Sequence, residues 1–334
     1  MFGAAVIGLG VGRQHILDYR ATGRAEVRVI CDLQEERLQR VGEELGIADR
    51  VTDFREVAAR DDVQVVSICT PDHLHTEPAL AMMEAGKHVL IEKPLATTWE
   101  DVRRLVETAH RTGVKVAHGC QLRYLPLYQE LKRHIERGEL GELFYAEGDY
   151  IGSHLELLTE GWRGQLGAAY NGVAGGGVHP LDLLCWLIGD RVVEVTAYGN
   201  KKCVEPFGFE VYDCIVAILK FQQGAIAKSL TTLAAARPGF RYLALYGTRG
   251  TYLNTPYPAQ NLIVTETTQQ QWQSLTVPPA ETEPRVALIQ DLLDAIERDT
   301  QPLVNLAEAA QVAAVCIAAF ESVQQGRPVL VPDR

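Results

Sequence analysis

The sequence predicts an α/β protein in which a doubly wound parallel sheet is followed by a second, α+β domain. Up to residue 120, short runs rich in Val, Ile and Ala alternate with longer amphipathic segments, as in βαβ units. Beyond Cys120 the rhythm changes to a few helices and then successive strands with glycine turns, which is typical of a mostly antiparallel sheet. We therefore expect one domain over residues 1–120 and another over residues 121–334.

Each strand of the first domain is expected where a short apolar run precedes a helical pattern. Right-handed crossovers then place the helices on both faces of the sheet. We expect strands at 3–10, 25–32, 63–71, 88–94 and 114–120, and helices at 13–23, 34–46, 75–86 and 98–113.

The second domain is expected to combine helices with an open sheet. Its helices are expected at 127–141, 179–190, 284–299 and 306–326. Its strands are expected where apolar residues alternate with polar ones or where apolar runs end at turn glycines, at 142–153, 192–200, 212–221, 224–234, 240–254 and 261–267.

Composition excludes several classes of protein. The chain has 334 residues, 47% hydrophobic and 22% charged, which is ordinary for a globular protein with a sizeable core. A net charge of −11 argues against nucleic-acid or anionic-membrane partners. The seven cysteines form no CxxC pair, the N-terminus has no basic leader, and no apolar run approaches the ~18–20 residues that a membrane span needs. We expect a cytoplasmic protein.

A glycine loop joins the first strand to the first helix. The stretch "GLGVG" places Gly8, Gly10 and Gly12 there, with Val11 between the last two. Glycines permit a tight turn and a close approach of the backbone to a pyrophosphate at the helix N-terminus. The spacing is GxGxG, and Arg13 stands where GxGxxG has its third glycine. By itself the motif fits a plain tight turn as well as a dinucleotide site.

An acidic residue follows at the spacing of a dinucleotide-binding motif. Asp32 ends the second expected strand, 24 residues after Gly8, near the offset at which an acid binds the adenine ribose hydroxyls. Its charge would repel a 2′-phosphate, so NAD is favoured over NADP. The alternatives are that Asp32 caps the next helix and that Arg37 meets a phosphate. The combined pattern favours dinucleotide binding.

Four further stretches carry a resemblance to a known family. They are "TPDHLHTEPALAMMEAGKHVLIEKPLA", "GLGVGRQH", "CQLRYLP" and "GGGVHPLDLLCWL". Together they closely resemble the glucose–fructose oxidoreductase/inositol dehydrogenase (Gfo/Idh/MocA) family over essentially the whole chain. The resemblance implies a Rossmann domain, then an α+β domain whose open, mostly antiparallel sheet serves as a subunit interface in homodimers or homotetramers.

The Glu-Lys-Pro segment is the most specific of these motifs. The resemblance implies that Lys93 lies beside the nicotinamide and the reacting hydroxyl, that Glu92 supports it, and that Pro94 shapes the turn, often as a cis peptide. An ammonium there can stabilise developing alkoxide charge. The alternative is a surface lysine paired with Glu92. Ligands bind at the carboxyl ends of strands in such sheets, which favours the catalytic interpretation.

The expected base is His179, which follows a glycine run. A histidine suits removal of a hydroxyl proton near neutral pH. A lone histidine on an apolar helix usually belongs to the core, but the resemblance implies a catalytic one here. Asp182 lies three residues later on the same helical face and is expected to bind substrate or fix the histidine. The family often has aspartate at the position of Gly175, so the division of labour among Lys93, His179 and Asp182 stays open.

Other residues match the family less specifically. Thr70, Pro71 and His75 match its cofactor-side loop, and Gln121 and Arg123 match the strand that enters the second domain. Arg123 is expected to bind substrate or to form a domain-interface salt bridge, and Arg163 and Trp162 to line the substrate pocket or to pack. His15 is expected to pack near the cofactor. Asp72 and His75 alone do not make a metal site, so no metal is predicted.

These observations favour an NAD-dependent dehydrogenase that acts on a secondary hydroxyl of a sugar, inositol, nucleotide sugar or similar polyol. One alternative is a redox-neutral enzyme that holds NAD tightly and oxidises its substrate only transiently. Another is a non-catalytic regulator that senses the dinucleotide. A sensor has no need of Lys93 or His179, so their presence argues against it.

Overall fold

The computed structural model describes residues 1–236, 239–256, 259–266, 268–269 and 271–332. It divides into two compact units, of which the first comprises residues 1–124 and 280–310 and the second comprises 125–279 and 311–334. The sequence predicted one boundary near residue 120. The structure instead returns residues 280–310 to the first unit, because this late segment packs on the first helix and shares its apolar core.

The first unit is built on a six-stranded parallel sheet of order β3-β2-β1-β4-β5-β6. This is the doubly wound order of dinucleotide-binding domains, as predicted. Its strands are β1 (Phe2–Ile7), β2 (Ala25–Cys31), β3 (Asp49–Val51), β4 (Val65–Ile68), β5 (His88–Ile91) and β6 (Val116–His118). Its helices are α1 (Gly12–Thr22), α2 (Glu35–Leu45), α3 (Phe54–Ala58), η1 (Asp72–Leu74), α4 (Thr76–Glu84), α5 (Trp99–Thr112), η2 (Gln121–Tyr124) and α10 (Pro284–Arg298).

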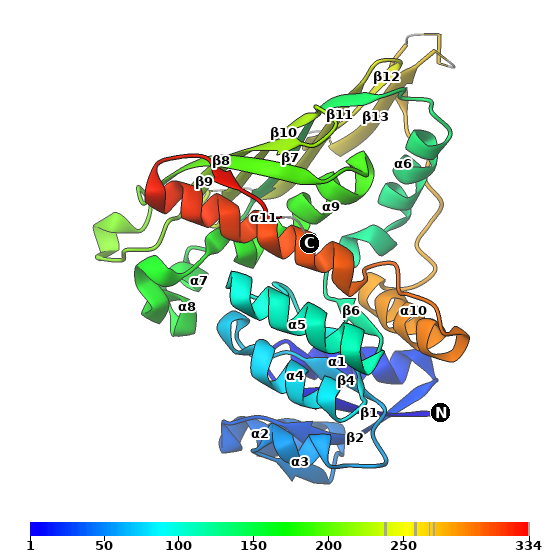
Figure 1. Cartoon of the computed structure of the whole chain (residues 1–334), viewed down its shortest axis with the longest axis vertical. Helices are drawn as coiled ribbons and strands as arrows, with labels where there is room; N and C mark the ends of the chain where they lie inside the picture. Colours follow the sequence, from blue (N-terminus) through cyan, green and yellow to red (C-terminus); the bar gives the residue numbers. More distant parts are fainter. Residues whose placement is uncertain (237–238, 257–258, 267, 270, 333–334) are drawn as a thin grey trace. The chain divides into compact units, whose positions relative to one another are not determined.

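The helices of the first unit begin and end where the sequence provides caps. Thr98 accepts a hydrogen bond from the backbone N–H of Asp101 at the start of α5, and Gly23, Gly46 and Gly113 close α1, α2 and α5 in the left-handed conformation. The apolar faces of α1, α2 and α10 share one buried cluster with the strands. Helices α4 and α5 lie side by side in front of the strands (Figure 1).

The second unit contains a nine-stranded sheet of order β14-β13-β12-β11-β7-β10-β9-β8-β15. All its pairings are antiparallel except that between β7 and β10. The strands are β7 (Leu143–Ile151), β8 (Val192–Asn200), β9 (Cys214–Phe221), β10 (Ile226–Thr232), β11 (Phe240–Gly247), β12 (Gly250–Pro256), β13 (Ala259–Thr265), β14 (Gln273–Ser274) and β15 (Val329–Leu330). The expected open, mostly antiparallel sheet is confirmed; residue 267, the end of one expected strand, lies outside the described residues.

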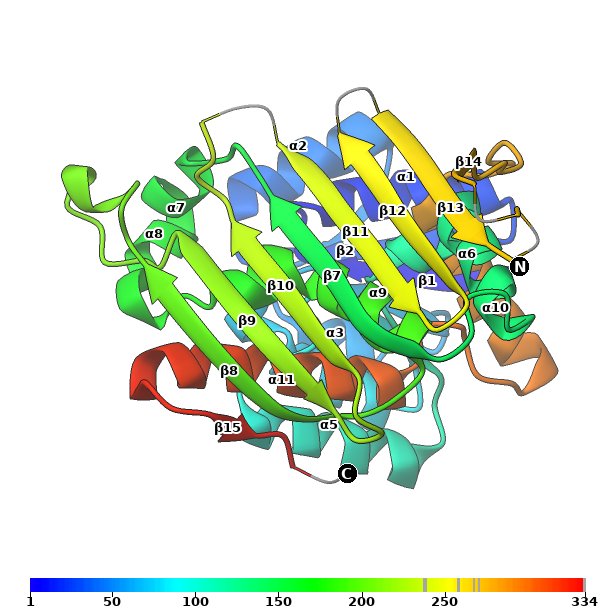
Figure 2. The same cartoon turned by 90° about the horizontal axis from the view of Figure 1, so that it is seen from above.

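The helical segments of this unit carry the second group of candidate residues. They are α6 (Pro126–Glu136), α7 (Glu156–Thr159), α8 (Gly161–Leu166), η3 (Gly167–Ala169), η4 (Val173–Gly177), α9 (Val178–Ile188) and η5 (Glu205–Phe207), with most of α11 (Leu306–Gln325). Helix α9 packs on β7, where Gly148 faces Leu184, and Ser322 of α11 accepts a hydrogen bond from the backbone of β8. Figure 2 looks onto the opposite face of this sheet, which no helix among the described residues covers.

Helix α11 corrects one expectation from the sequence. At 20 residues and a hydropathy of 1.5, it is long and apolar enough to cross a membrane by length and composition. More than half of the apolar window is buried inside the protein, including Val312, Cys316 and Ala319. A core helix passes the same test, and small residues such as alanine let it pack closely against its neighbours.

Candidate active site

The candidate cofactor residues follow the strands of the first unit at one edge of the parallel sheet. The glycine loop follows β1, Asp32 follows β2, Thr70 follows β4 and Lys93 follows β5. Because β1 pairs with both β2 and β4, the strand order reverses beside β1. Ligands of open α/β sheets bind beyond the carboxyl ends of the strands at such a point. The topology therefore brings these residues together, as the sequence predicted.

The three loop glycines differ in what a side chain at each position would meet. Gly8 has φ +87°, and a Cβ there would lie 2.5 Å from the carbonyl oxygen of Cys69. A Cβ on Gly12 would lie 2.7 Å from Val6 Cγ1, so this glycine lets α1 pack against the sheet. A Cβ on Gly10 would meet nothing within 4 Å. Gly12 thus allows the close packing of helix on strand that the third glycine allows in GxGxxG. Gly10 leaves space for a ligand at the start of α1.

Asp32 is held by backbone and side-chain donors between the glycine loop and α2. Its Oδ2 accepts the backbone N–H of Leu9 at 2.8 Å, and Oδ1 accepts that of Gln34 at 2.8 Å. Arg37 Nη1 lies 3.4 Å from Oδ2. Helix α2 begins after Gln34 without a side-chain cap, so the Asp32 carboxylate does not cap the helix itself. It fixes the loop instead, and Arg37 is drawn toward it rather than lying free on the helix face.

The loop after β4 is tied to the Glu-Lys-Pro segment through His75. Its Nδ1 lies 2.6 Å from the carbonyl oxygen of Pro94, and its Nε2 lies 2.9 Å from that of Thr70. The ring is buried, and burial lowers its pKa. Thr70 and Pro71, by contrast, are partly exposed. The structure therefore favours a role for His75 in joining the two loops, and Thr70 and Pro71 as the side chains open to a cofactor.

Glu92 and Lys93 do not form a simple surface pair. Glu92 is buried; its Oε1 lies 3.1 Å from His15 Nε2, and its Oε2 accepts the backbone N–H of Lys93 at 3.0 Å. Burial raises the pKa of Glu92, but contacts with His15 and Lys93 lower it to about 2. The Lys93–Pro94 peptide is cis, as expected. Lys93 is half-buried at the end of β5, with its backbone fixed by the preceding carboxylate.

Arg123 does not have the environment expected of a substrate ligand. Its side chain is 1% exposed, and its guanidinium pairs with Glu308 of the same unit and lies 3.4 Å from the carbonyl oxygen of Leu303. This geometry favours the salt-bridge alternative, with the pair formed inside one unit. Gln121, at the start of η2, is partly exposed.

The second unit presents His179 at the start of α9. A π-helical turn, η4, leads into this helix, and such turns recur at functional sites. Within residues 171–180 only Gly175 and His179 are partly exposed, so they mark one face. The Tyr150 ring of β7 stacks beside His179 with ring centroids 6.2 Å apart. Sequence reasoning missed Tyr150, although strand alternation predicts that it points to the α9 side.

The glycine run before His179 is filled by neighbouring side chains. A Cβ on Gly175 would collide with the hydroxyl of Tyr170, and one on Gly176 would lie 3.1 Å from the Tyr150 ring. The Tyr170 hydroxyl therefore takes the space that an aspartate side chain at position 175 would need. Tyr170 was not among the predicted site residues, since nothing in its local sequence distinguishes it from a core tyrosine.

Arg163 and Asp182 differ in exposure. The Arg163 guanidinium lies 4.3 Å from the centroid of the Trp162 ring, which meets Tyr170 edge-on at 5.9 Å. Arg163 is partly exposed and remains a candidate for substrate contact. Asp182 is fully buried near Cys316; burial raises the pKa of that thiol, and Cys185 and Asp182 raise it further. A substrate can contact Asp182 only by reaching into that buried region.

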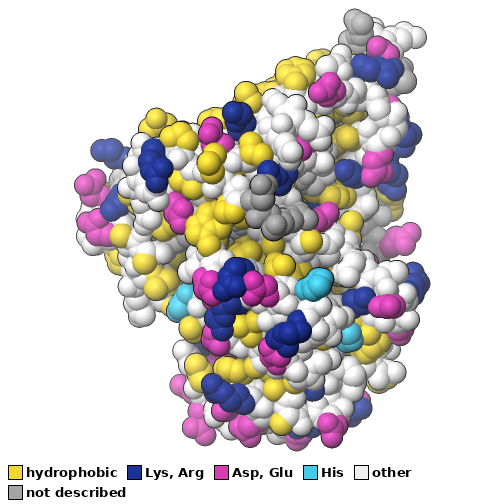
Figure 3. All heavy atoms as spheres, in the orientation of Figure 1, with side chains coloured by type: hydrophobic (Ala, Val, Ile, Leu, Met, Phe, Trp, Pro, Cys, Tyr) yellow, Lys and Arg dark blue, Asp and Glu magenta, His cyan; other side chains and the backbone are white. Residues whose placement is uncertain are grey.

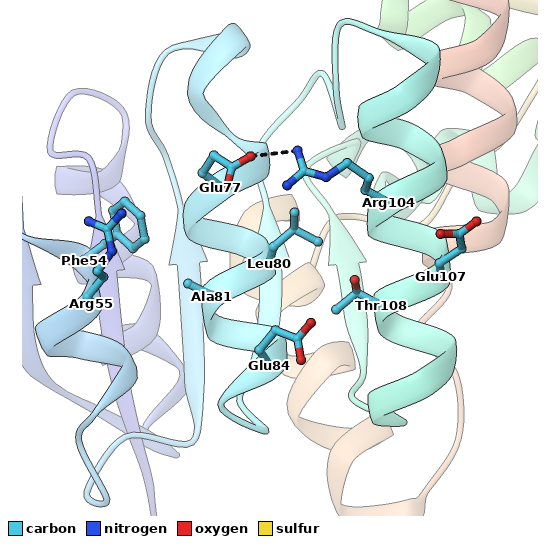
Figure 4. Close-up of a pocket in the computed structure, with 9 residues that line it drawn as sticks. All are labelled: Phe54, Arg55, Glu77, Leu80, Ala81, Glu84, Arg104, Glu107 and Thr108. Carbon is cyan, nitrogen blue, oxygen red and sulfur yellow. Dashed lines mark hydrogen bonds and ion pairs between the residues drawn. The ribbon is translucent and has the colours of Figure 1, made fainter.

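A surface pocket of the first unit lies apart from these residues. It has a volume of about 380 Å³ and is formed by α3, α4 and α5 (Figure 4), being lined by Phe54, Arg55, Glu77, Leu80, Ala81, Glu84, Arg104, Glu107 and Thr108. Its charged groups are paired, including Glu77 with Arg104 at 2.7 Å. Helix faces rather than strand ends build it, so it is not the cofactor site.

The residues of the first unit fit a dinucleotide. Gly10 is sterically open, the N-terminus of α1 offers its backbone N–H groups, and Asp32 presents a carboxylate at the end of β2. On the face shown in Figure 3, basic side chains are interspersed with acidic ones and form no continuous basic patch. Among the described residues, no group of three or more potential ligands could hold a metal ion.

Comparison with known proteins agrees with this geometry. A family described as "Oxidoreductase family, NAD-binding Rossmann fold" matches residues 2–120, and its "C-terminal alpha/beta domain" matches residues 132–331. The chain belongs to the GFO_IDH_MocA family of oxidoreductases. Both halves of the resemblance seen in the sequence are thereby confirmed.

Several members of this family are similar over most of the chain. The 1,5-anhydro-D-fructose reductase of Ensifer adhaerens is 32% identical over 261 residues, covering 74% of this chain and 73% of that protein. The myo-inositol 2-dehydrogenase of Thermotoga maritima is 27% identical over 252 residues, covering 73% and 72%. Levoglucosan dehydrogenase in complex with NADH and levoglucosan has the same fold, with a TM-score of 0.87, 23% identity and coverage of 99% and 100%.

Proposed function

We propose that this protein is an NAD-dependent dehydrogenase that transfers hydride between the nicotinamide and a secondary hydroxyl of a sugar, inositol or similar polyol. The observation that carries the proposal is the placement of Lys93. Its backbone is fixed by the buried carboxylate of Glu92 at the same sheet edge as the open Gly10. The names of the two similar proteins, a sugar reductase and an inositol dehydrogenase, support this substrate class.

In this proposal the side chains divide the proton chemistry between them. The Lys93 ammonium holds the substrate oxygen and stabilises the negative charge that develops on it. His179, partly exposed at the start of α9, accepts the hydroxyl proton. Bound NAD would supply the acceptor for the hydride. Thr70, Pro71, Val11 and Gln121 are proposed to contact the cofactor, and Arg163 and Asp182 the substrate.

Asp32 is proposed to select NAD over NADP. Its carboxylate already accepts two backbone N–H groups, and further lone pairs remain for the ribose hydroxyls. A 2′-phosphate at the same place would meet this negative charge. Arg37 lies close enough to matter, because its guanidinium already reaches Asp32.

We also infer that copies of the protein associate through the uncovered face of the second sheet. Tyr198 of β8 is 76% exposed there, and Val216, Ile218 and Ile226 of the neighbouring strands are exposed as well. Apolar side chains across adjacent strands mark an interaction surface. Light scattering of the purified protein would report a dimer or tetramer.

All seven cysteines are free, which fits the reducing cytoplasm.

The proposed activity is tested by NADH formation across a panel of inositols, aldoses, anhydrosugars and sugar acids. Wild type is run beside Lys93→Ala, with NADH affinity measured separately by fluorescence. We expect at least one polyol to reduce NAD, and Lys93→Ala to lower kcat at least ~100-fold with NADH affinity within a few-fold. Near-normal turnover by Lys93→Ala would remove Lys93 from the chemistry. A panel without any NADH formation, despite NAD binding, would overturn the dehydrogenase proposal.

A further inference from the structure

A buried histidine of the first unit links the glycine-loop helix to the segment that carries Lys93. His15 lies in α1, three residues after Gly12, and is 2% exposed. Its Nδ1 lies 3.1 Å from Ser67 Oγ on β4, and its Nε2 lies 3.1 Å from Glu92 Oε1 after β5. One imidazole thus bridges three elements that meet at the carboxyl edge of the sheet.

The hydrogen-bond partners of His15 can accept a proton from both ring nitrogens. Ser67 Oγ lies 3.1 Å from His15 Nδ1 and 3.1 Å from Tyr19 Oη, so this hydroxyl can accept from the ring while it donates to the tyrosine. The Glu92 carboxylate has no hydrogen to donate and therefore accepts at Nε2. An imidazole that donates from both nitrogens is an imidazolium. With both ring protons present, His15 and Glu92 form a buried ion pair.

The surrounding groups favour the same charge state. Burial lowers the pKa of His15, but Cys69 and Glu92 outweigh it and raise the pKa to about 10. Burial also raises the pKa of the Cys69 thiol, although His15 and Arg285 act to lower it. Glu92, whose Oε1 lies 3.1 Å from His15 Nε2, is the carboxylate among these partners.

The Glu92 carboxylate is enclosed on its other sides as well. A Cβ on Gly119 would lie 3.1 Å from Glu92 Cδ and 3.0 Å from the backbone nitrogen of Lys93. The neighbouring rings of His118 and His75 have lowered pKa values because both are buried, and that of His118 falls to about 3. The groups that lower the pKa of Glu92 are His15 and Lys93.

We propose that His15 is a positioning residue for Lys93. Its imidazolium keeps Glu92 ionised and fixed, and Glu92 Oε2 in turn holds the backbone N–H of Lys93, so that the helix after the glycine loop sets the position of the lysine. The inference rests on the proposed function only where it concerns turnover. The charge on His15 and the placement of Lys93 are properties of the folded protein alone.

A neutral residue at position 15 would leave Glu92 buried with too little positive charge. The pKa of Glu92 would then rise, because burial disfavours the carboxylate. A protonated Glu92 no longer accepts the Lys93 N–H as an anion. Turnover should therefore decline more steeply than in the wild type as the pH falls.

The first experiment measures the charge of His15 by NMR of the protein with ¹⁵N-labelled histidine. Resonances are assigned with His15→Gln, and the buried His118, whose ring nitrogens have no hydrogen-bond partner among the described residues, serves as the internal neutral reference. We expect both His15 nitrogens to show imidazolium shifts up to at least pH 8, and the charge to disappear at that pH in Glu92→Gln. A neutral His15 at pH 7 in the wild type would overturn the proposal.

The second experiment follows Lys93 and turnover in His15→Gln, with His110→Gln as the matched control because His110 is exposed on α5. We expect His15→Gln to shift the ¹³C resonance of reductively methylated Lys93 and to lower kcat about 10- to 100-fold, with NADH affinity and polyol KM within a few-fold. The acidic limb of the kcat profile should be steeper in His15→Gln than in the control, because Glu92 then titrates in addition to the base His179.

The outcomes separate the two proposals. An unmoved Lys93 resonance in folded His15→Gln would overturn the positioning role even if His15 is charged. A normal kcat with an unchanged pH profile in that variant would do the same. If the wild type turns over no polyol, the proposed function fails, while the histidine charge and the lysine resonance still decide this inference.

Discussion

The two units hold their candidate catalytic groups by different physical means. In the first, ionic and backbone hydrogen bonds fix them: Glu92 is bonded to His15 and Lys93, and Asp32 to two backbone N–H groups. In the second, His179 is placed by ring packing beside Tyr150 and by a glycine run that Tyr150 and Tyr170 fill. Directional bonds define one position for a group, whereas packed rings can be exchanged without changing the strands and helices beneath them.

This difference suggests where substrate choice is encoded. Residues after parallel strands are brought together by sheet topology itself, so the cofactor side has little freedom to vary. In the second unit, contacts between side chains hold Tyr150, Tyr170 and Trp162 in place. We expect substitutions among these rings to alter substrate preference, and substitutions at the strand ends to alter activity on every substrate.

The sharpest test of the second unit is His179→Asn. Loss of the proposed base should reduce kcat about 10²- to 10⁴-fold, with NADH affinity unchanged because the dinucleotide residues lie in the first unit. His154→Asn is the matched control, since His154 is a half-exposed histidine of the same unit. Steady-state kinetics and fluorescence titration measure the two effects. A kcat within a few-fold of wild type would return His179 to the role of a packing residue.

The glycine loop allows stability and cofactor binding to be separated. Gly8→Ala adds a Cβ at positive φ against Cys69 and should lower the free energy of unfolding by about 2 kcal/mol or more. Gly10→Ala meets no protein atom and should change it by no more than about 0.5 kcal/mol. The Gly10 variant should still weaken NADH binding about tenfold, because its methyl group occupies ligand space.

Urea unfolding and NADH titration of both glycine variants provide the measurement. If Gly10→Ala bound NADH normally, the open space beside the loop would have no part in the cofactor site. Equal destabilisation by both substitutions would contradict the steric distinction between the two positions.

The smallest expected effect concerns cofactor choice. Asp32→Ala should weaken NADH binding about tenfold, by loss of charge-assisted hydrogen bonds to the ribose. It should also improve NADPH binding, because the repelling carboxylate is gone and Arg37 is released to meet the phosphate. The double variant Asp32→Ala/Arg37→Ala should lose that gain. An unchanged ratio of NADH to NADPH affinity would exclude Asp32 from the ribose site.

The local sequence was sufficient for the elements and for the cofactor side. Apolar runs of strand length, glycine caps and the "GLGVG" and Glu-Lys-Pro stretches predicted the parallel sheet, the helix ends and the residues at its carboxyl edge. Predictions from these features succeed because the features depend on neighbours in the chain. A glycine with positive φ, or a polar residue that ends a buried strand, is recognisable within a few positions.

Other features depend on which distant residues meet. Three such features have no signal in the local sequence. Residues 280–310 belong to the first unit, Arg123 pairs with Glu308, and the Tyr170 hydroxyl occupies the space beside Gly175.

The contacts of His15 are the clearest case. Its neighbours in sequence predict only a buried helix face, whereas Ser67 and Glu92 lie 52 and 77 residues away in the chain. Whether a buried imidazole is charged depends on donors and acceptors that only the folded sheet places against it, because removal from water disfavours the ion unless a counter-charge is close.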